Sequence, residues 1–262
     1  MDAATGVAVM INEEDHLRLQ AIAPGMRLQE TWERLDAIDS ALEDLVTFAF
    51  HDDFGYLTAC PSNVGTGLRA SVMMQLPGLK LQGEVERVIN GIERMGYTVR
   101  GVLGEGTEAH GNMFQVSNQQ TMGDSEADIL SRFTDIVLEV ACHENHARLR
   151  LMESSRSRLL DWIARACAIL QHAQVLASQE TLDLLSAVRL GVEVGAVCGS
   201  SRESLDEIML LTQRGHLQKI LKKRLGPEDR DVQRAKLVRE ALQGLEFVDT
   251  LTENRSAEET SS

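Results

Sequence analysis

Cysteine, proline and aromatic residues are all scarce in this sequence. The four cysteines (Cys60, Cys142, Cys167 and Cys198) are scattered without a CxxC pair, which indicates free thiols in a reducing cytoplasm. No apolar run approaches the length of a membrane span, and the first residues lack a signal-peptide pattern. Four prolines and an aromatic content of 4% predict a helix-rich chain.

Positive charge is scarce as well. The 26 lysines and arginines stand against 40 acidic residues, which gives a net charge of −14. This argues against a general nucleic-acid binder, because such proteins need a basic surface. An anionic ligand would have to be held by local cations against the overall field, so the positions of the arginines are informative. No GxxxxGK[ST] loop occurs, which excludes a P-loop nucleotide site.

The chain of 262 residues, with 43% apolar and 25% charged residues, is long enough to bury a core. Apolar periodicity predicts a mixed α+β first half and an all-helical second half. The helices expected in the first half cover 28–45 and 81–95, and the short strands cover 6–11, 46–50, 54–59, 71–76, 97–102 and 113–116. So few strands predict an incomplete sheet.

From Ser125 the pattern is helical to about residue 245. Capping boxes are expected at Ser125, with Asp128, and at Ser204, with Glu207. Further helix starts are expected at Ser178 and at Pro227, since proline is favoured in a first turn. We therefore expect one domain over 1–150, a helical domain over 151–250, and a polar, disordered tail over 251–262.

Three short segments each combine an arginine with an acid or a thiol: 12–18 (NEEDHLR), 60–69 (CPSNVGTGLR) and 100–105 (RGVLGE). Guanidinium is planar, always charged and bidentate, so it suits phosphate oxygens. Carboxylates suit the opposite task of binding a cation. If the segments meet in space, they form a site for a polyphosphate and a basic group, which indicates phosphoryl transfer.

The first two segments differ in how strongly they point to a site. The Glu13-Glu14 pair by itself is typical of a solvated face, although it follows an apolar strand, where a site residue would lie. Pro61 disfavours helical geometry at Cys60, and the loop after it offers backbone N–H groups that can surround an anion. Arg69 could lower the pKa of the thiol. The alternative is an inert, buried cysteine.

Other patterns are weaker. Residues 65–70 match GxGxxA, but no full helix is expected to open there, so we reject a dinucleotide site. The glycine-interrupted segment 100–107 has the form of an active-site lid or of an ordinary surface loop. Cys142, His143 and His146 do not complete a tetrahedral set, so no metal site is expected.

The segment 230–235 (RDVQRA) lies on the helix expected after Pro227. Arg230 and Arg234 share one face, and Asp231 can pair with Arg234 three residues on and orient it. Two interpretations remain open here, a second anion pocket and a salt-bridged exposed face.

Together these residues resemble the phosphagen (guanidino) kinases. The patterns NEEDHLR, CPSNVGTGLRASV and RGVLGEGTEAHGNMFQVSNQQTMG fit that family in order and interval over residues 6–125. The helical remainder with its RDxxRA segment resembles the bacterial branch that phosphorylates arginine residues in proteins, the McsB-type protein-arginine kinases. The resemblance covers the chain apart from its tail.

The resemblance implies an α+β fold, with part of an antiparallel-sheet catalytic domain over 1–150 and a helical C-terminal domain over 151–250. It implies ATP with Mg²⁺ as phosphoryl donor and proteins bearing arginine as acceptors, marked in this way for regulated degradation or stress response. It also implies a homodimer in the cytoplasm with scope for an activator protein. No nucleic acid or membrane partner and no protein-bound metal are expected.

The resemblance also assigns roles to residues. Glu14 would hold and deprotonate the acceptor guanidinium, Glu105 would clamp its other side, and Cys60 would tune its electrostatics. The nucleotide would be bound by Arg18, Arg69, Ala70, Ser71, Val72, Met73, Arg100, Gly101, Val102, Leu103, Gly104 and Glu105. A regulatory phosphoarginine pocket would be formed by Arg230, Asp231, Arg234 and Ala235.

Physical chemistry supports these roles. Guanidinium is a poor nucleophile because its pKa exceeds 12, so two carboxylates must localise its charge and accept a proton. The phosphoryl group then needs in-line positioning and several cations. Met73 stands where many kinases of small guanidines would have a histidine, which favours the protein-arginine branch.

One departure from the family affects the expected activity. The family has an upstream arginine-bearing strand of the Ser-Ser-Arg-x-Arg type, and no such segment occurs in this sequence. We therefore expect the sequence to begin inside the catalytic domain. Two alternatives stay open: a phosphoarginine-binding or dimerising module without turnover, and a kinase of a small free guanidine, against which the long helical half speaks.

Overall fold

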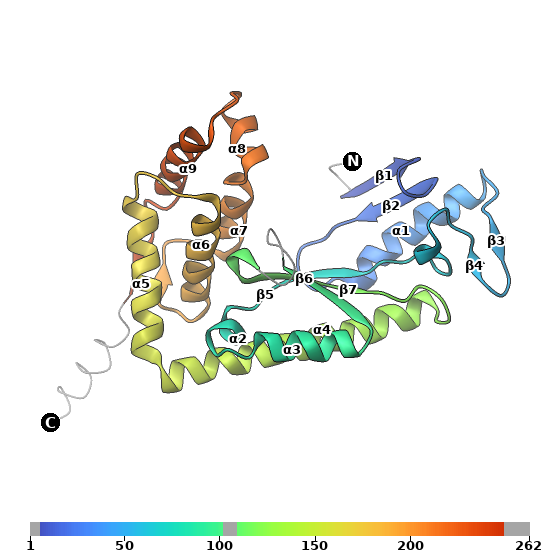
Figure 1. Cartoon of the computed structure of the whole chain (residues 1–262), viewed down its shortest axis with the longest axis horizontal. Helices are drawn as coiled ribbons and strands as arrows, with labels where there is room; N and C mark the ends of the chain where they lie inside the picture. Colours follow the sequence, from blue (N-terminus) through green and yellow to red (C-terminus); the bar gives the residue numbers. More distant parts are fainter. Residues whose placement is uncertain (1–5, 102–108, 249–262) are drawn as a thin grey trace. The chain divides into compact units, whose positions relative to one another are not determined.

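The computed structural model describes residues 6–101 and 109–248. The chain divides into two compact units (Figure 1). The first, here called the sheet unit, comprises Met1–Met74, Glu86–Arg100 and Gln115–Cys142. The second, the helical unit, comprises Gln75–Val85, Gly101–Phe114 and His143–Ser262. Mixed helices and small sheets make this an α+β fold, as the sequence predicted.

The described part of the sheet unit begins with a two-stranded antiparallel ribbon. Strand β1 (Val7–Ile11) pairs with β2 (Leu17–Ala21), with Ile11 opposite Leu17 at the closed end. The turn between them is closed by the Asn12 N–H, which donates to the His16 carbonyl at 3.0 Å. The sequence predicted β1 but not β2, because the charged motif 12–18 obscures the start of the returning strand.

Helix α1 (Leu28–Glu43) and a short hairpin follow. The strands predicted over 46–50 and 54–59 are too long, since only β3 (Phe50–His51) and β4 (Gly55–Tyr56) pair. One further bond, from the Leu57 N–H to the Ala49 carbonyl at 2.8 Å, extends the pairing. Beyond it the chain turns to Asp15, which accepts the Cys60 N–H at 3.0 Å. The Tyr56 backbone bridges to Gly65, outside the hairpin, and its ring packs edge-on against Phe50 at 5.4 Å.

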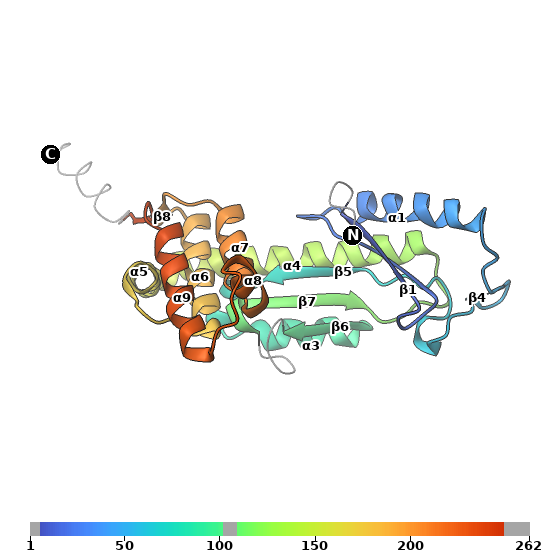
Figure 2. The ribbon, with the colours of Figure 1, turned by 90° about the horizontal axis from the view of Figure 1, so that it is seen from above.

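A three-stranded sheet forms the centre of the unit, in the order β5-β7-β6 (Figure 2). Its strands are β5 (Ser71–Gln75), β6 (Tyr97–Gly101) and β7 (Met113–Asn118). The Asn118 N–H donates to the Ala70 carbonyl and the Leu76 N–H to the Asn112 carbonyl, so β5 and β7 run antiparallel. Helices α3 (Val85–Arg94) and α4 (Glu126–Ser154) supply apolar side chains, and the Phe133 ring stacks on Tyr97 at 5.6 Å.

The helix predicted over 81–95 is confirmed as α3, which begins four residues later, and a further short helix precedes it. Helix α2 (Pro77–Leu81) begins at the proline that was expected only to end a strand, and Gly83, with a φ of 71°, separates it from α3. The buried carboxylate of Glu144 accepts the N–H groups of Gly78 and Leu79 at 2.8 and 2.9 Å. This carboxylate satisfies donors at the start of α2 that have no partner within the helix.

The helical unit packs its helices around one apolar core. The helices that contribute to it include α5 (Arg156–His172), α6 (Ser178–Glu193), α7 (Arg202–Leu211) and α9 (Pro227–Ala241), while α8 (Arg214–Ile220) lies between α7 and α9 in the chain. A small ribbon of β8 (Val197–Cys198) with β9 (Glu246–Phe247) also belongs to this unit. Two short turns complete the elements: η1 (Pro61–Asn63) in the sheet unit and η2 (His110–Asn112) in the helical unit. Among the described residues, no helix is long and apolar enough to cross a membrane.

The predicted helix starts are confirmed with one exception. Ser125 accepts the Asp128 N–H at 3.2 Å, and α6 and α9 begin at Ser178 and Pro227. The capping box at Ser204 is wrong. Helix α7 begins earlier, because Ser201 is its cap and accepts the N–H of Ser204 at 3.2 Å.

Candidate functional site

The first charged segment lies at the turn between β1 and β2. Arg18 Nη1 is 2.9 Å from Glu13 Oε2 and 4.0 Å from Glu14 Oε2. The hydrogen bond from Arg18 holds the pKa of Glu13 below its usual value. The side chains of Arg18 and Glu14 are 46% and 49% exposed, so a cation and a carboxylate are both accessible at one turn.

Asp15 joins this turn to residues 60–69, here called the cysteine loop. The sequence analysis did not predict this link. Its Oδ1 accepts the Cys60 N–H at 3.0 Å, and its Oδ2 accepts the Asn63 side-chain amide at 2.7 Å. Burial works to raise the pKa of Asp15, but these hydrogen bonds outweigh it and the pKa is lowered. An aspartate within an acidic run carries no local signal of a partner 45 residues away.

Cys60 lies where the chain enters the turn η1. Its φ of −90° and ψ of 117° are extended, which confirms the effect predicted for Pro61. The thiol is half-buried, and its Sγ lies 3.0 Å from Ser62 Oγ. The Cys60 thiol is therefore partly accessible and contacts a hydroxyl group, and its backbone is held by Asp15. These features do not fit the alternative of an inert cysteine buried in the core.

The rest of the cysteine loop is fastened to the segment after β7. Thr121 accepts the Thr66 N–H on its carbonyl at 2.7 Å, and its hydroxyl donates to the Val64 carbonyl at 2.7 Å. Gly65 lies in this approach with a φ of 115°, and an added Cβ would meet the Thr121 carbonyl oxygen at 2.1 Å. Only glycine therefore fits at this position.

Asn118 holds the end of the loop where it becomes strand β5. Its Oδ1 accepts the Ala70 N–H at 2.8 Å, and its amide donates to the carbonyls of Leu68 and Gln120 at 3.0 and 2.9 Å. Strand β5 continues from residue 71 without a helix, in agreement with the rejection of a dinucleotide fingerprint. One amide thus fixes the backbone on both sides of Arg69.

Two of the predicted phosphate-binding arginines lie at the three-stranded sheet, one just before β5 and one on β6. Arg69 is exposed just before β5 and donates to Ser117 Oγ on β7 at 3.4 Å. Arg100 is exposed on β6, beside Val99, which is only 5% exposed. Since side chains alternate along a strand, Arg100 lies on the face opposite Val99.

The other predicted nucleotide positions fall partly within the described chain. Ala70 is buried, Ser71 and Val72 are half-buried, and Met73 is 57% exposed on β5. Gly101 ends β6. The positions Val102, Leu103, Gly104 and Glu105 lie outside the described residues, as do most of the expected lid and the expected tail over 251–262.

In the helical unit, Arg234 is a buried side chain with 2% exposure. Its Nε donates to the Thr212 carbonyl at 3.0 Å and its Nη1 to the Leu176 carbonyl at 2.7 Å. Asp231 also accepts from Nη1, as the spacing predicted. Ala235 is fully buried, so the alternative of an exposed, salt-bridged face is wrong for this half of the motif.

Arg230 has a different environment. It is half-buried, and its Nη1 donates to the Leu225 carbonyl at 2.9 Å. The motif therefore presents one partly accessible guanidinium beside a buried one. Among the described residues, no group of three or more His, Cys, Asp or Glu side chains could hold a metal ion.

Comparison with known proteins identifies the class. The model of the ATP:guanido phosphotransferase C-terminal catalytic domain matches residues 1–147, and the model of the protein-arginine kinase McsB C-terminal domain matches residues 156–258. The chain therefore belongs to the ATP:guanido phosphotransferase family, an enzyme family of kinases. This confirms the resemblance seen in the sequence.

The relatives narrow the class further. The chain is 45% identical to a protein-arginine kinase of Clostridium acetobutylicum over 236 residues, 90% of this chain and 69% of the relative. It is 48% identical to that of Moorella thermoacetica over 238 residues, 91% of this chain and 68% of the relative. The sequence is thus most readily compared with the protein-arginine kinase branch.

Solved structures of the wider family are similar over smaller parts. A lombricine kinase matches with 30% identity and a TM-score of 0.48, over 55% of this chain and 40% of that one. A duplicated taurocyamine kinase from Schistosoma mansoni with bound transition-state analogue components matches with 27% identity and a TM-score of 0.49, over 66% and 26%. The chain spans less than two thirds of either structure.

Proposed function

We propose that this chain transfers the γ-phosphoryl group of ATP to a guanidinium nitrogen of arginine side chains in proteins. The observation that carries the proposal is the link through Asp15, which holds the acid-and-arginine turn against the cysteine loop. Its relatives named protein-arginine kinases support the choice of acceptor. The arrangement puts a carboxylate, a thiol and a cation on neighbouring loops of one unit.

In the proposed mechanism, Glu14 binds the acceptor guanidinium and accepts its proton. The free guanidinium has a pKa above 12 and no available lone pair, so a carboxylate contact must localise the charge on one side before the other nitrogen can attack. Glu105 is proposed as the second carboxylate, and Cys60 as the group beside the reacting nitrogen. The hydrogen bonds of Asp15 would keep the Cys60 backbone in place during the transfer.

ATP is the phosphoryl donor that the family implies, and the proposed binding groups are Arg18, Arg69 and Arg100. Each is exposed, and together they would stabilise charge that spreads over the phosphoryl oxygens in the transition state. Residues 70–73 and 101–105 would line the nucleotide. We propose that Mg²⁺ arrives bound to the ATP phosphates.

The proposal for the helical unit is a phosphoarginine pocket built on Arg230, Asp231, Arg234 and Ala235. Arg230 would contact the phosphate, because it is the partly accessible guanidinium of the motif. The buried Arg234 would hold Asp231 and the surrounding backbone in place. The domains proposed are 1–150 and 151–250. A homodimer, an activator protein and a reducing cytoplasm, consistent with four cysteines that form no disulfide, complete the proposal.

The test is a kinase assay with this chain, ATP-Mg²⁺ and an arginine-rich protein. A second form carries an added Ser-Ser-Arg-x-Arg strand upstream, to complete the phosphate clamp that the resemblance implies. We expect acid-labile phosphate on arginine, greater with the second form. Absence of acid-labile phosphate from both would refute the proposal. Phosphoarginine binding without any transfer would favour the binding-module alternative, and transfer to free arginine alone would favour the small-guanidine alternative.

A further inference from the structure

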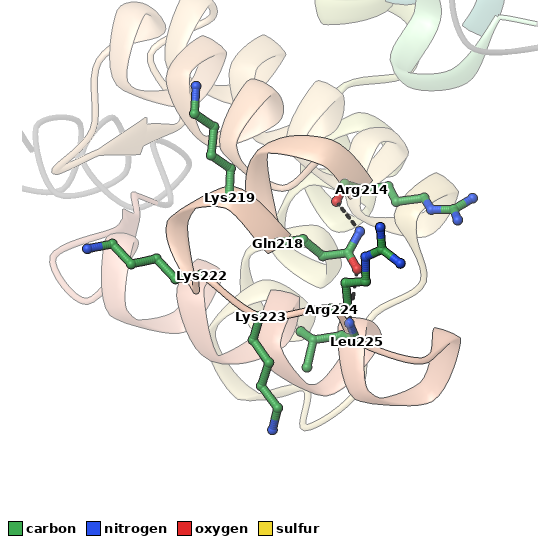
Figure 3. Close-up of a pocket in the computed structure, with 7 residues that line it drawn as sticks. All are labelled: Arg214, Gln218, Lys219, Lys222, Lys223, Arg224 and Leu225. Carbon is green, nitrogen blue, oxygen red and sulfur yellow. Dashed lines mark hydrogen bonds between the residues drawn. The ribbon is translucent and has the colours of Figure 1, made fainter.

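Helix α8 and the turn after it carry a concentration of positive charge that the proposed phosphoryl transfer does not use. Residues 214–224 contain five cations and no carboxylate, although the whole chain has a net charge of −14. Three of the five lysines in the sequence lie here. Together with Gln218 and Leu225, the five cations line a surface hollow of about 650 Å³ (Figure 3). They are Arg214, Lys219, Lys222, Lys223 and Arg224.

These cations have no counter-ions within the described part of the chain. All five are exposed, and none forms an ion pair with a described carboxylate. Arginines elsewhere in the helical unit do pair, as Arg189 does with Asp206 at 2.7 Å. Five unpaired like charges on so short a segment repel one another and create a local positive potential. That potential is what an anionic partner would neutralise.

The backbone at the hollow is also strained at a charged residue. Lys222 has a φ of 51°, in the left-handed region that favours glycine. The Lys223 N–H donates to the Gln218 carbonyl at 3.2 Å and the Lys222 N–H to the Lys219 carbonyl at 3.3 Å. This is the hydrogen-bond pattern of a Schellman motif, in which glycine is the usual residue at the left-handed position. With lysine at this position the folded chain is less stable than it would be with glycine, but the position carries a positive charge.

The side chains fit an extended partner better than a compact one. Lys219, Lys222 and Lys223 point outward in different directions, while Arg214 and Arg224 lie beside Gln218 (Figure 3). The cations therefore do not converge on a single point, as they would around one phosphate group. Gln218 holds two parts of the backbone around the hollow together. Its Oε1 accepts the Leu225 N–H at 2.9 Å, and its amide donates to the Arg214 carbonyl at 3.1 Å.

Apolar side chains among the cations indicate the class of partner. Ile220 and Leu221 are 47% and 39% exposed between Lys219 and Lys222. The segment 214–225 contains no Phe, Tyr or Trp on which nucleic-acid bases could stack. Exposed aliphatic groups rimmed by charge are typical of a protein interaction site. We propose that this basic hollow is a docking site for an acidic polypeptide segment that also carries apolar side chains.

The binding test uses the full chain and a fluorescein-labelled peptide of glutamates with interspersed leucines, followed by fluorescence anisotropy at low salt. The variant Lys222→Gln/Lys223→Gln/Arg224→Gln removes three cations of the hollow. The matched control is Lys80→Gln/Arg158→Gln/Lys236→Gln, which removes three exposed cations that do not line it. Circular dichroism verifies that each variant is folded.

We expect the hollow variant to weaken peptide binding by at least about tenfold and the control to change it by less than about twofold. Binding of the parent should weaken as salt rises, because the cations are exposed. Equal losses in both variants, or no binding by the parent, would overturn the proposal.

Two further measurements define the partner and separate strain from binding. A glutamate-only peptide, a single-stranded oligonucleotide and inorganic polyphosphate are measured alongside the leucine-containing peptide. Tighter binding of any of the three would overturn the assignment to an acidic, apolar segment. In Lys222→Gly the melting temperature should rise while peptide affinity falls about two- to threefold. If Lys222→Gly bound the peptide as tightly as the parent, Lys222 would have no part in docking.

Discussion

The carboxylate of Asp15 accepts the backbone N–H of Cys60 at 3.0 Å, across 45 residues of sequence. With the Asn63 amide on its second oxygen, Asp15 joins the acidic turn to the cysteine loop. Both partners belong to the same compact unit. The two motifs proposed to handle the acceptor guanidinium are thus fixed to each other by one side chain.

Replacing Asp15 should reduce catalysis by misplacing neighbouring groups. In Asp15→Ala we expect kcat for arginine phosphorylation to fall by about 10²-fold, because small displacements of reacting groups are that costly. Asp15→Asn can keep one acceptor oxygen, so its kcat should fall by less. Steady-state kinetics with a peptide substrate measures both, and an Asp15→Ala enzyme with unchanged kcat would contradict the positioning role.

Glu14→Gln tests the proposed base directly. The amide is nearly isosteric but cannot accept a proton from the guanidinium, so kcat should fall by about 10²–10⁴-fold. Unfolding should be nearly unchanged, since the Glu14 side chain is 49% exposed. The control is Glu86→Gln on α3, another exposed acid. Full activity in Glu14→Gln would assign the base elsewhere.

Arg234 should matter more for stability than any other residue of its motif. Arg234→Ala leaves the Thr212 and Leu176 carbonyls without their donor and Asp231 without its partner. We expect the free energy of unfolding to fall by about 3–5 kcal/mol. The nearby exposed Lys236→Ala should change it by no more than about 0.5 kcal/mol. Urea unfolding provides the comparison, and equal effects would refute a structural role for Arg234.

The raised pKa of Tyr56 leads us to expect that the folded chain loses stability at high pH. Burial, followed by the charges of Asp39 and Glu43, raises the pKa of Tyr56 to about 12. The unfolded chain releases this proton near the usual value of 10, so the contribution is complete below that pH and is lost as pH rises toward 12. The urea midpoint should fall over this range. In Tyr56→Phe the urea midpoint should fall less steeply with pH. The remaining slope would come from Tyr97, because burial also raises its pKa.

Local sequence signals predicted several elements well because their causes are local. Pro61 holds Cys60 extended through a steric clash with its neighbour, and Pro227 begins α9 because its fixed φ suits a first turn. The cap predicted at Ser204 was wrong by three residues. Two serines lie near the start of α7, and the one that caps the helix is Ser201. The hairpin strands were shorter than predicted because the chain after Leu57 turns to Asp15, a partner distant in the sequence.

By itself the sequence determined the kinds of chemistry available: accessible acids and arginines in short loops, a thiol ahead of a proline, and a family pattern that the comparisons confirm. Only the tertiary structure decided that Asp15 ties two motifs together and that Arg234 is buried while Arg230 is half-buried. It also decided that the cations of 214–224 line one hollow and form no ion pair with a carboxylate of the described residues. The physical reason is range. Steric and capping preferences act within a few residues, whereas hydrogen bonds across 45 or 58 residues depend on the path of the whole chain.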